Sequence, residues 1–307
     1  MTYREDIAAA RTRIAGHIRR TPIQTTKAFG LNHPVEMKLE HLQHTGSFKV
    51  RGAFNTLLSM PVPATGIVAA SGGNHGAAVA YASAKLGHRA RVYVPEIAGP
   101  AKIDLIRRQG GDLQVVEGAY SNALEAAQRY EQETGAMQIH AYDAARTVSG
   151  QGTCMAEWED QGLEADTVLI AVGGGGLIAG ALAWLDGRRK VVAVEPNTCS
   201  ALHAAMAAGG PVDVEVSGVA ANALGARRIG SICFDIATAQ DLHCVLVSDD
   251  DITAAQRALW QDMRLLVEPA GAATLAALMS GAYRPEKDER VAVLICGGNI
   301  APDPFQT

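Results

Sequence analysis

Four consecutive glycines after a buried strand constrain the fold of this chain more than any other stretch. Residues 167–172 are apolar after the first position, as in a strand covered on both faces, and residues 177–185 are typical of a helix. Glycines between a strand and a helix let the backbone approach a phosphate, which the N–H groups and dipole of the helix N-terminus attract. The alternative is a merely flexible loop. We predict a phosphate-binding loop formed by Gly173, Gly174, Gly175 and Gly176.

Strands and helices alternate along the rest of the chain. Residues 35–40 alternate between apolar and charged side chains, which predicts a strand. Largely apolar stretches predict further strands at residues 66–70, 91–94, 113–116, 191–195 and 290–295. Helical patterns are present at residues 5–20, 51–60, 77–86, 100–109, 120–135, 249–266 and 270–279. We expect Asp250 or Asp251 to cap the helix at 249–266. Such alternation implies right-handed βαβ crossovers, so we predict an α/β fold of two unequal lobes, each with a mainly parallel sheet flanked by helices.

Composition and charge exclude several classes of function. The chain has 307 residues, 48% of them hydrophobic, and its net charge of -5 gives no basic footprint for nucleic acid. No apolar run reaches the length of a membrane span, and the N-terminus lacks the apolar core of a signal peptide. The five cysteines include no CxxC pair, which argues against a disulfide framework or a structural zinc site. We expect a cytoplasmic protein with no nucleic-acid or membrane partner.

One lysine stands in an unusual setting. Lys49 lies between Phe48 and the β-branched Val50, in the stretch Ser-Phe-Lys-Val-Arg-Gly. A lysine buried there would have a lowered pKa, and its neutral amine could form a Schiff base with a carbonyl group. The alternative is a surface lysine at the start of the helix predicted for residues 51–60.

Two further loops carry polar groups at the ends of predicted strands. Residues 71–76 are Ser-Gly-Gly-Asn-His-Gly, and residues 296–299 are Cys-Gly-Gly-Asn. The amides of the first loop suit a carboxylate, and Asn74 can donate a hydrogen bond to an oxygen. The alternative for that loop is an ordinary capped helix start. Ligands of open α/β sheets collect at the carboxyl ends of strands, so we expect both loops and the tetraglycine loop to meet at one site.

A dinucleotide site is the alternative of another class. Gly174, Gly176 and Ala179 fit the GxGxxA fingerprint of nicotinamide-dependent oxidoreductases. Glu195 lies about where an acid would bind the ribose. This interpretation gives no role to the lysine or to the two polar loops.

Taken together, the motifs resemble one family of enzymes. They are similar to motifs of the pyridoxal-phosphate enzymes of the threonine dehydratase and serine racemase group, in the same order and over nearly the whole chain. The motifs are the stretch around Lys49, the loop at residues 71–76, the tetraglycine loop, Glu268-Pro269 and the loop at residues 296–299. The resemblance implies fold type II, the tryptophan-synthase-β type, and pyridoxal 5'-phosphate as the cofactor. It implies a large cofactor-binding domain with a small one inserted in it, at residues 1–61 with 142–307 and at residues 62–141. We also expect a homodimer.

The resemblance assigns roles to residues of the motifs. It implies that Lys49 holds the cofactor covalently and acts as the base at the substrate Cα, and that Asn74 donates to the ring hydroxyl. Cys296 would face the pyridine nitrogen, and Glu268 would lie near the ring. The cofactor-binding residues are then Phe48, Lys49, Asn74, Gly173, Gly174, Gly175, Gly176, Leu177, Glu268 and Cys296. The substrate carboxylate would be received by the amides and side chains of Ser71, Gly72, Gly73, Asn74 and His75.

The chain departs from the family pattern at two positions. Where the racemases carry a serine hydroxyl on the face opposite the lysine, this chain has Gly72, which carries no proton. Glu195 matches a glutamate of the family's cation site, but Ala201 replaces a second acidic ligand. A hard divalent ion needs several oxygen ligands, so we predict no metal site, with Glu195 as the one candidate ligand. The alternative for Glu195 is a strand-end carboxylate that faces solvent.

These observations predict a pyridoxal-phosphate-dependent ammonia-lyase that acts on a small amino acid. We expect β-elimination of L-threonine or L-serine to a 2-oxo acid and ammonia. Two alternatives stay open within this chemistry: another β-hydroxy amino acid, including an intermediate of compatible-solute breakdown, and racemisation of serine. The nicotinamide-dependent oxidoreductase is the alternative of another class, and a yellow colour of the purified protein would separate the two.

Overall fold

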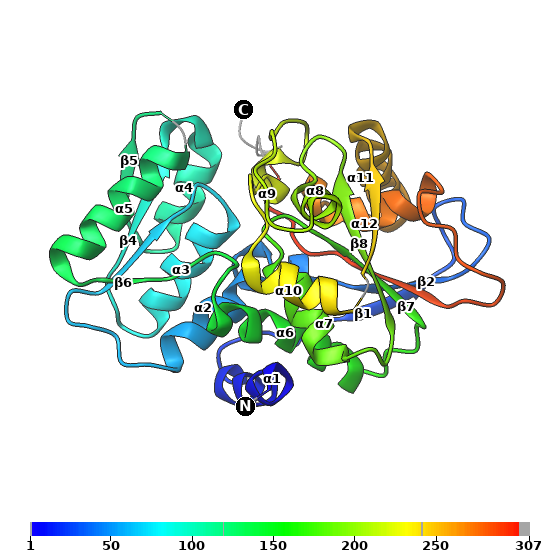
Figure 1. The fold of residues 1–307 in the computed structure, drawn as a ribbon, viewed down its shortest axis with the longest axis horizontal. Coiled ribbons are helices and arrows are strands. Elements are labelled where there is room, and N and C mark those ends of the chain that lie inside the picture. The colour runs from blue at the N-terminus through cyan, green and yellow to red at the C-terminus, as the bar shows by residue number, and fades with distance from the viewer. Residues whose placement is uncertain (1, 119, 241, 301–307) are drawn as a thin grey trace.

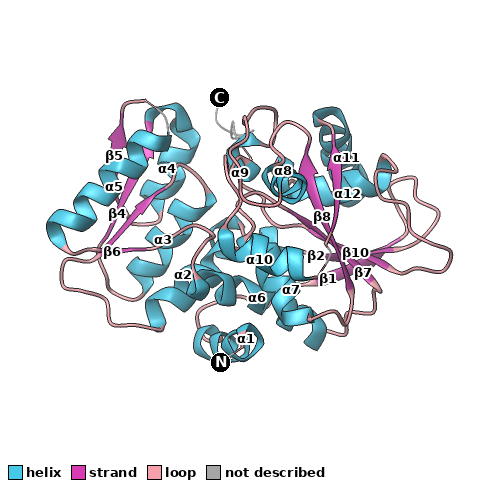
Figure 2. Ribbon diagram, viewed as in Figure 1, coloured by secondary structure: helices cyan, strands magenta, loops and turns pink. Residues whose placement is uncertain are grey.

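Two β-sheets organise the chain, and helices cover both of them (Figure 1, Figure 2). The computed structural model describes residues 2–118, 120–240 and 242–300. In Figure 1 the smaller sheet lies on the left and the larger sheet on the right, with the N-terminal helix below the region between them. The prediction of an α/β fold with two unequal, mainly parallel sheets is confirmed.

In the described part of the chain, the larger sheet has six strands in the order β1-β2-β10-β7-β8-β9. Along that order they are β1 (Ile23–Thr26), β2 (Val35–Lys38), β10 (Val291–Leu294), β7 (Thr167–Ala171), β8 (Lys190–Pro196) and β9 (His243–Val247). Neighbours are parallel except β1 and β2, which are antiparallel. Every residue of β7 and β10 is buried, which explains why both are continuous apolar runs in the sequence.

Among the same residues, the smaller sheet has four parallel strands in the order β5-β4-β3-β6. They are β5 (Asp112–Val116), β4 (Ala90–Pro95), β3 (Ile67–Ala70) and β6 (Met137–Gln138). All four lie within residues 62–141, the range predicted for the small domain. The domain boundaries themselves stay a prediction.

The helices fill the chain between these strands. In chain order the α-helices are α1 (Tyr3–Ile14), α2 (Lys49–Leu58), α3 (Asn74–Lys85), α4 (Pro100–Arg108), α5 (Tyr120–Thr134), α6 (Ala145–Asp160), α7 (Gly176–Leu185), α8 (Ala201–Ala208), α9 (Ala221–Leu224), α10 (Ser231–Ala239), α11 (Asp249–Met263) and α12 (Pro269–Met279). Short 3-10 turns are η1 (Glu40–Leu42), η2 (His44–Gly46) and η3 (Glu96–Ala98). Figure 1 shows α11 and α12 above the larger sheet and α6 and α7 below it.

Strand β3 is buried on both faces of its sheet. Ile67 and Ala69 belong to an apolar cluster that includes residues of α2 and α3. Val68 and Ala70 point the other way and pack with residues of α5. Alternate side chains of one strand thus hold a helical layer on each face.

Helix α6 is almost entirely buried between α2 and α7. Glycines make this close packing possible. A Cβ on Gly150 would lie 2.6 Å from Cα of Gly52, and one on Gly180 would lie 2.8 Å from Cα of Gly152. Because α6 is covered on nearly all sides, it lacks the polar face by which a surface helix is recognised, and it was not predicted from the sequence.

The predicted cap of the helix at 249–266 was wrong. Ser248, rather than Asp250 or Asp251, is the N-cap of α11. Its hydroxyl accepts a hydrogen bond from the amide of Asp251 at 3.1 Å, and the Asp251 carboxylate accepts one from the amide of Ser248 at 3.0 Å. This capping box places Asp251 at the third helical position instead of the cap. The helix ends at Met263, three residues earlier than expected, where Arg264 adopts a φ of 57°.

A buried network of charges joins the larger sheet to α2. The guanidinium of the fully buried Arg51 donates to both carboxylate oxygens of Glu40, at 2.8 and 2.7 Å. Lys38 donates to Glu157 of α6 at 2.6 Å, and Arg51 approaches the same carboxylate at 3.1 Å. Burial by itself would raise the pKa of Glu40, but the charge and hydrogen bonds of Arg51 lower it below its usual value. The network fixes the first turn of α2, where Lys49 lies.

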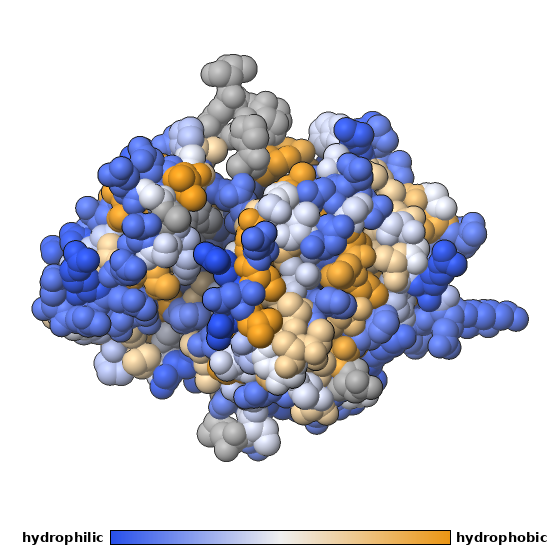
Figure 3. Space-filling model, turned by 45° about the horizontal axis from the view of Figure 1, so that its top comes forward, coloured by the Kyte–Doolittle hydropathy of each residue, from blue (hydrophilic) through white to orange (hydrophobic). Residues whose placement is uncertain are grey.

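Apolar side chains lie mainly inside, around the two sheets. In the view of Figure 3, hydrophilic residues cover much of the left lobe, and apolar residues reach the surface mainly toward the middle of this face. No helix within residues 2–118, 120–240 and 242–300 is long and apolar enough to cross a membrane.

Replacement of Arg51 tests what the buried network contributes to stability. Arg51→Met leaves the Glu40 carboxylate buried without its partner, so we expect the free energy of unfolding to fall by about 3–5 kcal/mol. Urea unfolding followed by circular dichroism measures the change. Arg290→Met is the matched control, since Arg290 pairs with Asp166 at 3.0 Å on the surface, where an ion pair contributes little. Equal unfolding midpoints for Arg51→Met and the wild type would contradict this account.

Candidate active site

One cavity brings together the residues that the sequence analysis assigned to a cofactor. It lies where the loops after β7 and β10 meet the start of α2. We call it the inner cavity, and every residue predicted to bind the cofactor lines it. Its walls are formed by Phe48, Lys49, Asn74, Tyr142, Ala171, Gly173, Gly174, Gly175, Gly176, Leu177, Ile178, Ala223, Leu224, Glu268, Ala270 and Cys296.

The tetraglycine loop has no room for side chains. A Cβ on Gly173 would lie 2.9 Å from Cα of Leu224, and one on Gly174 would fall onto the ring of Tyr142. Gly175 has a φ of 89°, a conformation that favours glycine. Helix α7 begins at the fourth glycine, so the amides of its first turn have no partner within the helix. Bare backbone, free amides and the positive end of the helix dipole fit a phosphate group.

A segment that was not predicted from the sequence, residues 140–143, covers this loop. Its conformation depends on His140, whose Nδ1 accepts hydrogen bonds from the amides of Tyr142 at 3.3 Å and Asp143 at 2.8 Å. Asp143 accepts a further bond from the amide of Ile232 in α10 at 3.0 Å. The segment follows β6, which has only two residues and therefore shows no strand pattern. Had β6 been recognised, its carboxyl end would have pointed to Tyr142.

Lys49 is the first residue of α2, so it does lie at the start of a helix. It is half-buried, however, and not a surface lysine. Its Nζ donates to the carbonyl of Ala141 at 2.9 Å and lies 5.2 Å from the ring centroid of Phe48. Burial lowers the pKa of Lys49 to about 8, although Cys296 and Glu268 act in the opposite direction. An amine with this pKa can lose its proton near neutral pH, as a nucleophile or a base must.

Cys296 follows β10 and is tied to the lysine stretch. Its carbonyl accepts a hydrogen bond from the amide of Phe48 at 3.3 Å, and its thiol donates to the carbonyl of Ala270 at 3.3 Å. Burial raises the pKa of the thiol, so Cys296 is neutral at ordinary pH.

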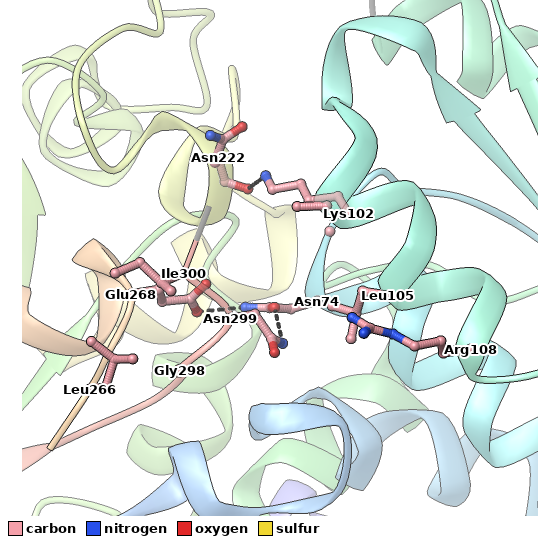
Figure 4. A pocket seen from close by; sticks show the side chains of 12 residues that line it. Asn74, Lys102, Leu105, Arg108, Asn222, Leu266, Glu268, Gly298, Asn299 and Ile300 are labelled. Carbon is pink, nitrogen blue, oxygen red and sulfur yellow. Dashed lines mark hydrogen bonds between the residues drawn. The ribbon is translucent and has the colours of Figure 1, made fainter. Parts of the chain in front are cut away.

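A second cavity, which we call the outer cavity, shares Asn74 and Glu268 with the first (Figure 4). Asn74 joins the two lobes here. Its Nδ2 donates to Oε1 of Glu268 at 2.6 Å, and its Oδ1 accepts from Nδ2 of Asn299 at 2.7 Å. Lys102 of α4 reaches across to the carbonyl of Asn222 at 3.5 Å. The outer cavity is lined by Gly73, Asn74, Ala101, Lys102, Leu105, Arg108, Asn222, Leu266, Glu268, Gly298, Asn299 and Ile300.

The loop predicted to receive a carboxylate lies at the carboxyl end of β3. Helix α3 begins at Asn74 with Gly73 as its N-cap, so the amides of its first turn have no partner within the helix. Ser71 turns back on the loop, and its Oγ accepts from the amide of Gly73 at 3.2 Å. Of the predicted set, Gly73 and Asn74 line the outer cavity, whereas the other three residues line neither cavity.

The side chain of His75 does not take part in this arrangement. Its ring is buried, and Nε2 donates to the carbonyl of Ile139 at 2.8 Å. Burial lowers the pKa of His75 to about 3, so the ring is neutral. His75 can therefore offer a ligand its backbone amide only.

Glu195 does not face solvent, so that alternative was wrong. It is fully buried at the end of β8, and its carboxylate accepts hydrogen bonds from the amides of Leu202 and His203 in α8, both at 2.8 Å. Burial raises its pKa to about 7. The carboxylate thus satisfies free amides at the N-terminus of α8. Within the described ranges, no group of three or more His, Cys, Asp or Glu side chains could hold a metal ion.

Comparisons with known proteins identify the family. Residues 14–297 match the family described as pyridoxal-phosphate dependent enzyme. The chain is 36% identical over 300 residues to phenylserine dehydratase of Ralstonia pickettii, covering 95% of this chain and 92% of that protein. It is 32% identical over 311 residues to β-hydroxyaspartate dehydratase of Paracoccus denitrificans, covering 98% and 97%. The solved crystal structure of T.th. threonine deaminase is similar with a TM-score of 0.90 and 33% identity, covering 98% and 99%.

This chain therefore belongs to the pyridoxal-phosphate-dependent enzymes, of fold type II, and its cofactor is pyridoxal 5'-phosphate. Membership of this family argues against the alternative of a nicotinamide-dependent oxidoreductase. The inner cavity fits this cofactor on its own geometry. It offers a lysine amine for the carbonyl carbon, a glycine cradle at a helix N-terminus for the phosphate, and a buried neutral thiol for the ring nitrogen. The roles of individual residues remain proposals.

Borohydride reduction of the cofactor-loaded protein tests the role of Lys49. We expect a pyridoxyl adduct on the peptide that contains Lys49, because its amine lines the inner cavity and burial lowers its pKa. Mass spectrometry of a digest locates the adduct. Lys49→Ala should lose turnover and keep its circular dichroism spectrum, since the side chain is not part of the apolar core. An adduct on Lys38 or Lys102 would contradict the assignment.

Proposed function

We propose that this chain is a dehydratase of β-hydroxy amino acids, with L-threonine or L-serine as first candidates, and that it forms a 2-oxo acid and ammonia. The observation that carries the proposal is that the cavity containing Lys49 and the glycine cradle shares two residues with a second, outer cavity. Three similar proteins support the reaction, since the name of each denotes a β-hydroxy amino acid as substrate. The homodimer and the cytoplasmic location stay predictions.

Each part of the site has a task in this proposal. Pyridoxal phosphate supplies the electron sink for the electron pair left at the substrate Cα. Lys49 removes the α-proton, which suits a half-buried amine with a pKa of about 8. The free amides at the N-terminus of α3 bind the substrate carboxylate. Asn74 uses one N–H on Glu268, and its second N–H is available to the ring hydroxyl.

Cys296 sets the strength of the electron sink in this scheme. Because its buried thiol is neutral, it does not force the ring nitrogen to be protonated. A moderate sink favours elimination of a β-substituent over a long-lived carbanion at Cα.

The outer cavity also offers partners for a β-hydroxy amino acid with a side chain larger than that of threonine. The compatible-solute intermediate stays an alternative substrate. Four residues of helix α4 line the cavity. They are Ala101 and, one, four and seven residues after it, Lys102, Leu105 and Arg108, so apolar and cationic side chains share one face of the helix. Leu266 and other residues of the larger lobe form the opposite wall. A phenyl or a carboxylate substituent would find partners on these walls.

A substrate panel tests the proposed function. The purified holoenzyme is given L-threonine, L-serine, L-phenylserine and L-3-hydroxyaspartate, and both 2-oxo acid and ammonia are measured. We expect equal amounts of the two products from at least one compound. L-Alanine, which has no β-leaving group, is the control. Absence of 2-oxo acid with every member of the panel would contradict the proposal.

The stereochemistry of the products separates a lyase from a racemase. Racemisation needs a proton donor on each face of Cα, and Gly72 has no side chain to serve the face opposite Lys49. A positioned acid contributes roughly 10²–10⁴-fold to a rate, so reprotonation by water should be slow. We expect L-serine to give mainly pyruvate and ammonia, with little D-serine, by chiral chromatography of a partly consumed reaction. D-Serine that forms as fast as pyruvate would refute this.

A serine at position 72 needs space that the structure lacks. A Cβ on Gly72 would lie 2.5 Å from Cβ of Ala98 in η3, so Gly72→Ser alone must displace that turn. Ala98→Gly removes the opposing methyl group. The racemase share should therefore rise more in the double variant than in Gly72→Ser, while Ala98→Gly alone behaves as the wild type.

A further inference from the structure

Glu268 lies at the junction of the two cavities. Of the described residues, Asn74 and Glu268 line both, and the carboxyl group of Glu268 can carry a proton whereas the amide of Asn74 cannot give one up. On the basis of the proposed function, we propose that Glu268 is the general acid that protonates the departing β-hydroxyl group of the substrate.

The contacts of Glu268 leave one oxygen free for this role. The side chain is largely buried, with 5% of the residue exposed, at the N-cap of α12. Oε1 accepts the hydrogen bond from Asn74, which fixes the orientation of the carboxyl group. In the part of the chain that the structure describes, Oε2 has no hydrogen-bond partner, so it can hold the proton that is transferred.

The surroundings of Glu268 favour a carboxyl group that stays protonated near neutral pH. Among the described residues, Lys49 in the inner cavity, Lys102 across the outer cavity and the thiol of Cys296 interact with its charge, and Arg108 lines the outer cavity with it. Burial raises the pKa of Glu268 to about 7, against the opposite effects of the Asn74 hydrogen bond and the two lysines. An acid with a pKa close to the working pH is suited to proton transfer in a transition state.

The proposed step balances without any further reactant. Lys49 takes the α-proton, and the C–H electron pair forms the bond between Cα and Cβ. The Cβ–O bond breaks as Glu268 gives its proton to the oxygen, which leaves as water. The released enamine takes up water and loses ammonia to form the 2-oxo acid. The proton held by Lys49 replaces the one lost by Glu268 through solvent.

The dependence on the leaving group tests the inference. Chloride leaves β-chloro-L-alanine without a proton, whereas a hydroxyl group needs one. In the Glu268→Gln holoenzyme we expect kcat/KM to fall by roughly 10²–10⁴-fold for L-serine, or for the β-hydroxy amino acid that the wild type uses best. For β-chloro-L-alanine we expect little change. Cofactor affinity, from a visible absorbance titration with pyridoxal phosphate, should match the wild type, because the glutamine carbonyl still accepts from Asn74.

The pH dependence gives a second readout. The proposed acid is active when protonated, so it is lost as pH rises through its pKa of about 7. The wild-type rate with the hydroxy amino acid, relative to that with β-chloro-L-alanine, should fall above that pH. The same ratio should stay flat in Glu268→Gln.

Two variants serve as controls. Glu268→Asp keeps an acid and should recover part of the loss with the hydroxy amino acid. Glu195→Gln makes the same chemical change in a buried carboxyl group that lines neither cavity, and it should affect both substrates alike.

Three results would overturn the inference. Equal losses with both substrates, or weakened cofactor binding, would assign Glu268 to positioning. An unchanged rate with the hydroxy amino acid would point to another acid, such as the cofactor phosphate. Failure of the proposed function looks different, since the wild type would then form no 2-oxo acid from any β-hydroxy amino acid, and the inference would fall with it.

Discussion

The inner and outer cavities lie where parallel strands of both sheets end. Strand β3 of the smaller sheet and strands β7 and β10 of the larger sheet each lead into a glycine-containing loop. The hydrogen bonds of Asn74 to Glu268 and Asn299 hold these loops together across the two lobes. The outer cavity therefore has walls from both lobes, and neither lobe alone forms it.

Burial shifts the pKa values of the titratable side chains at these strand ends. Lys49 loses part of its hydration, and its pKa falls, while the pKa of Glu268 rises for the same reason. Two titratable side chains with neighbouring pKa values thus line one pair of cavities. The buried pair of Arg51 and Glu40 holds the turn that carries Lys49, so the stability of this lobe and the placement of the lysine share one network.

The sequence could predict the loops but not the contacts between them. The tetraglycine loop was predictable because buried strands and glycines leave a clear local pattern, and β7 and α7 are where that pattern places them. Helix α6 was not, because a helix covered on all sides has no polar face. Tyr142 was missed because it follows a strand of two residues. The partners of Glu195 and Arg51 depend on tertiary packing, which no local pattern contains.

A crystal structure of the holoenzyme is the most direct test of the central claim, that the inner cavity holds pyridoxal phosphate on Lys49. We predict continuous electron density from Nζ of Lys49 to the cofactor, with the phosphate group against the backbone of residues 173–177 and the ring nitrogen beside Cys296. Density that joins the cofactor to another lysine, or a phosphate group bound away from the four glycines, would contradict it.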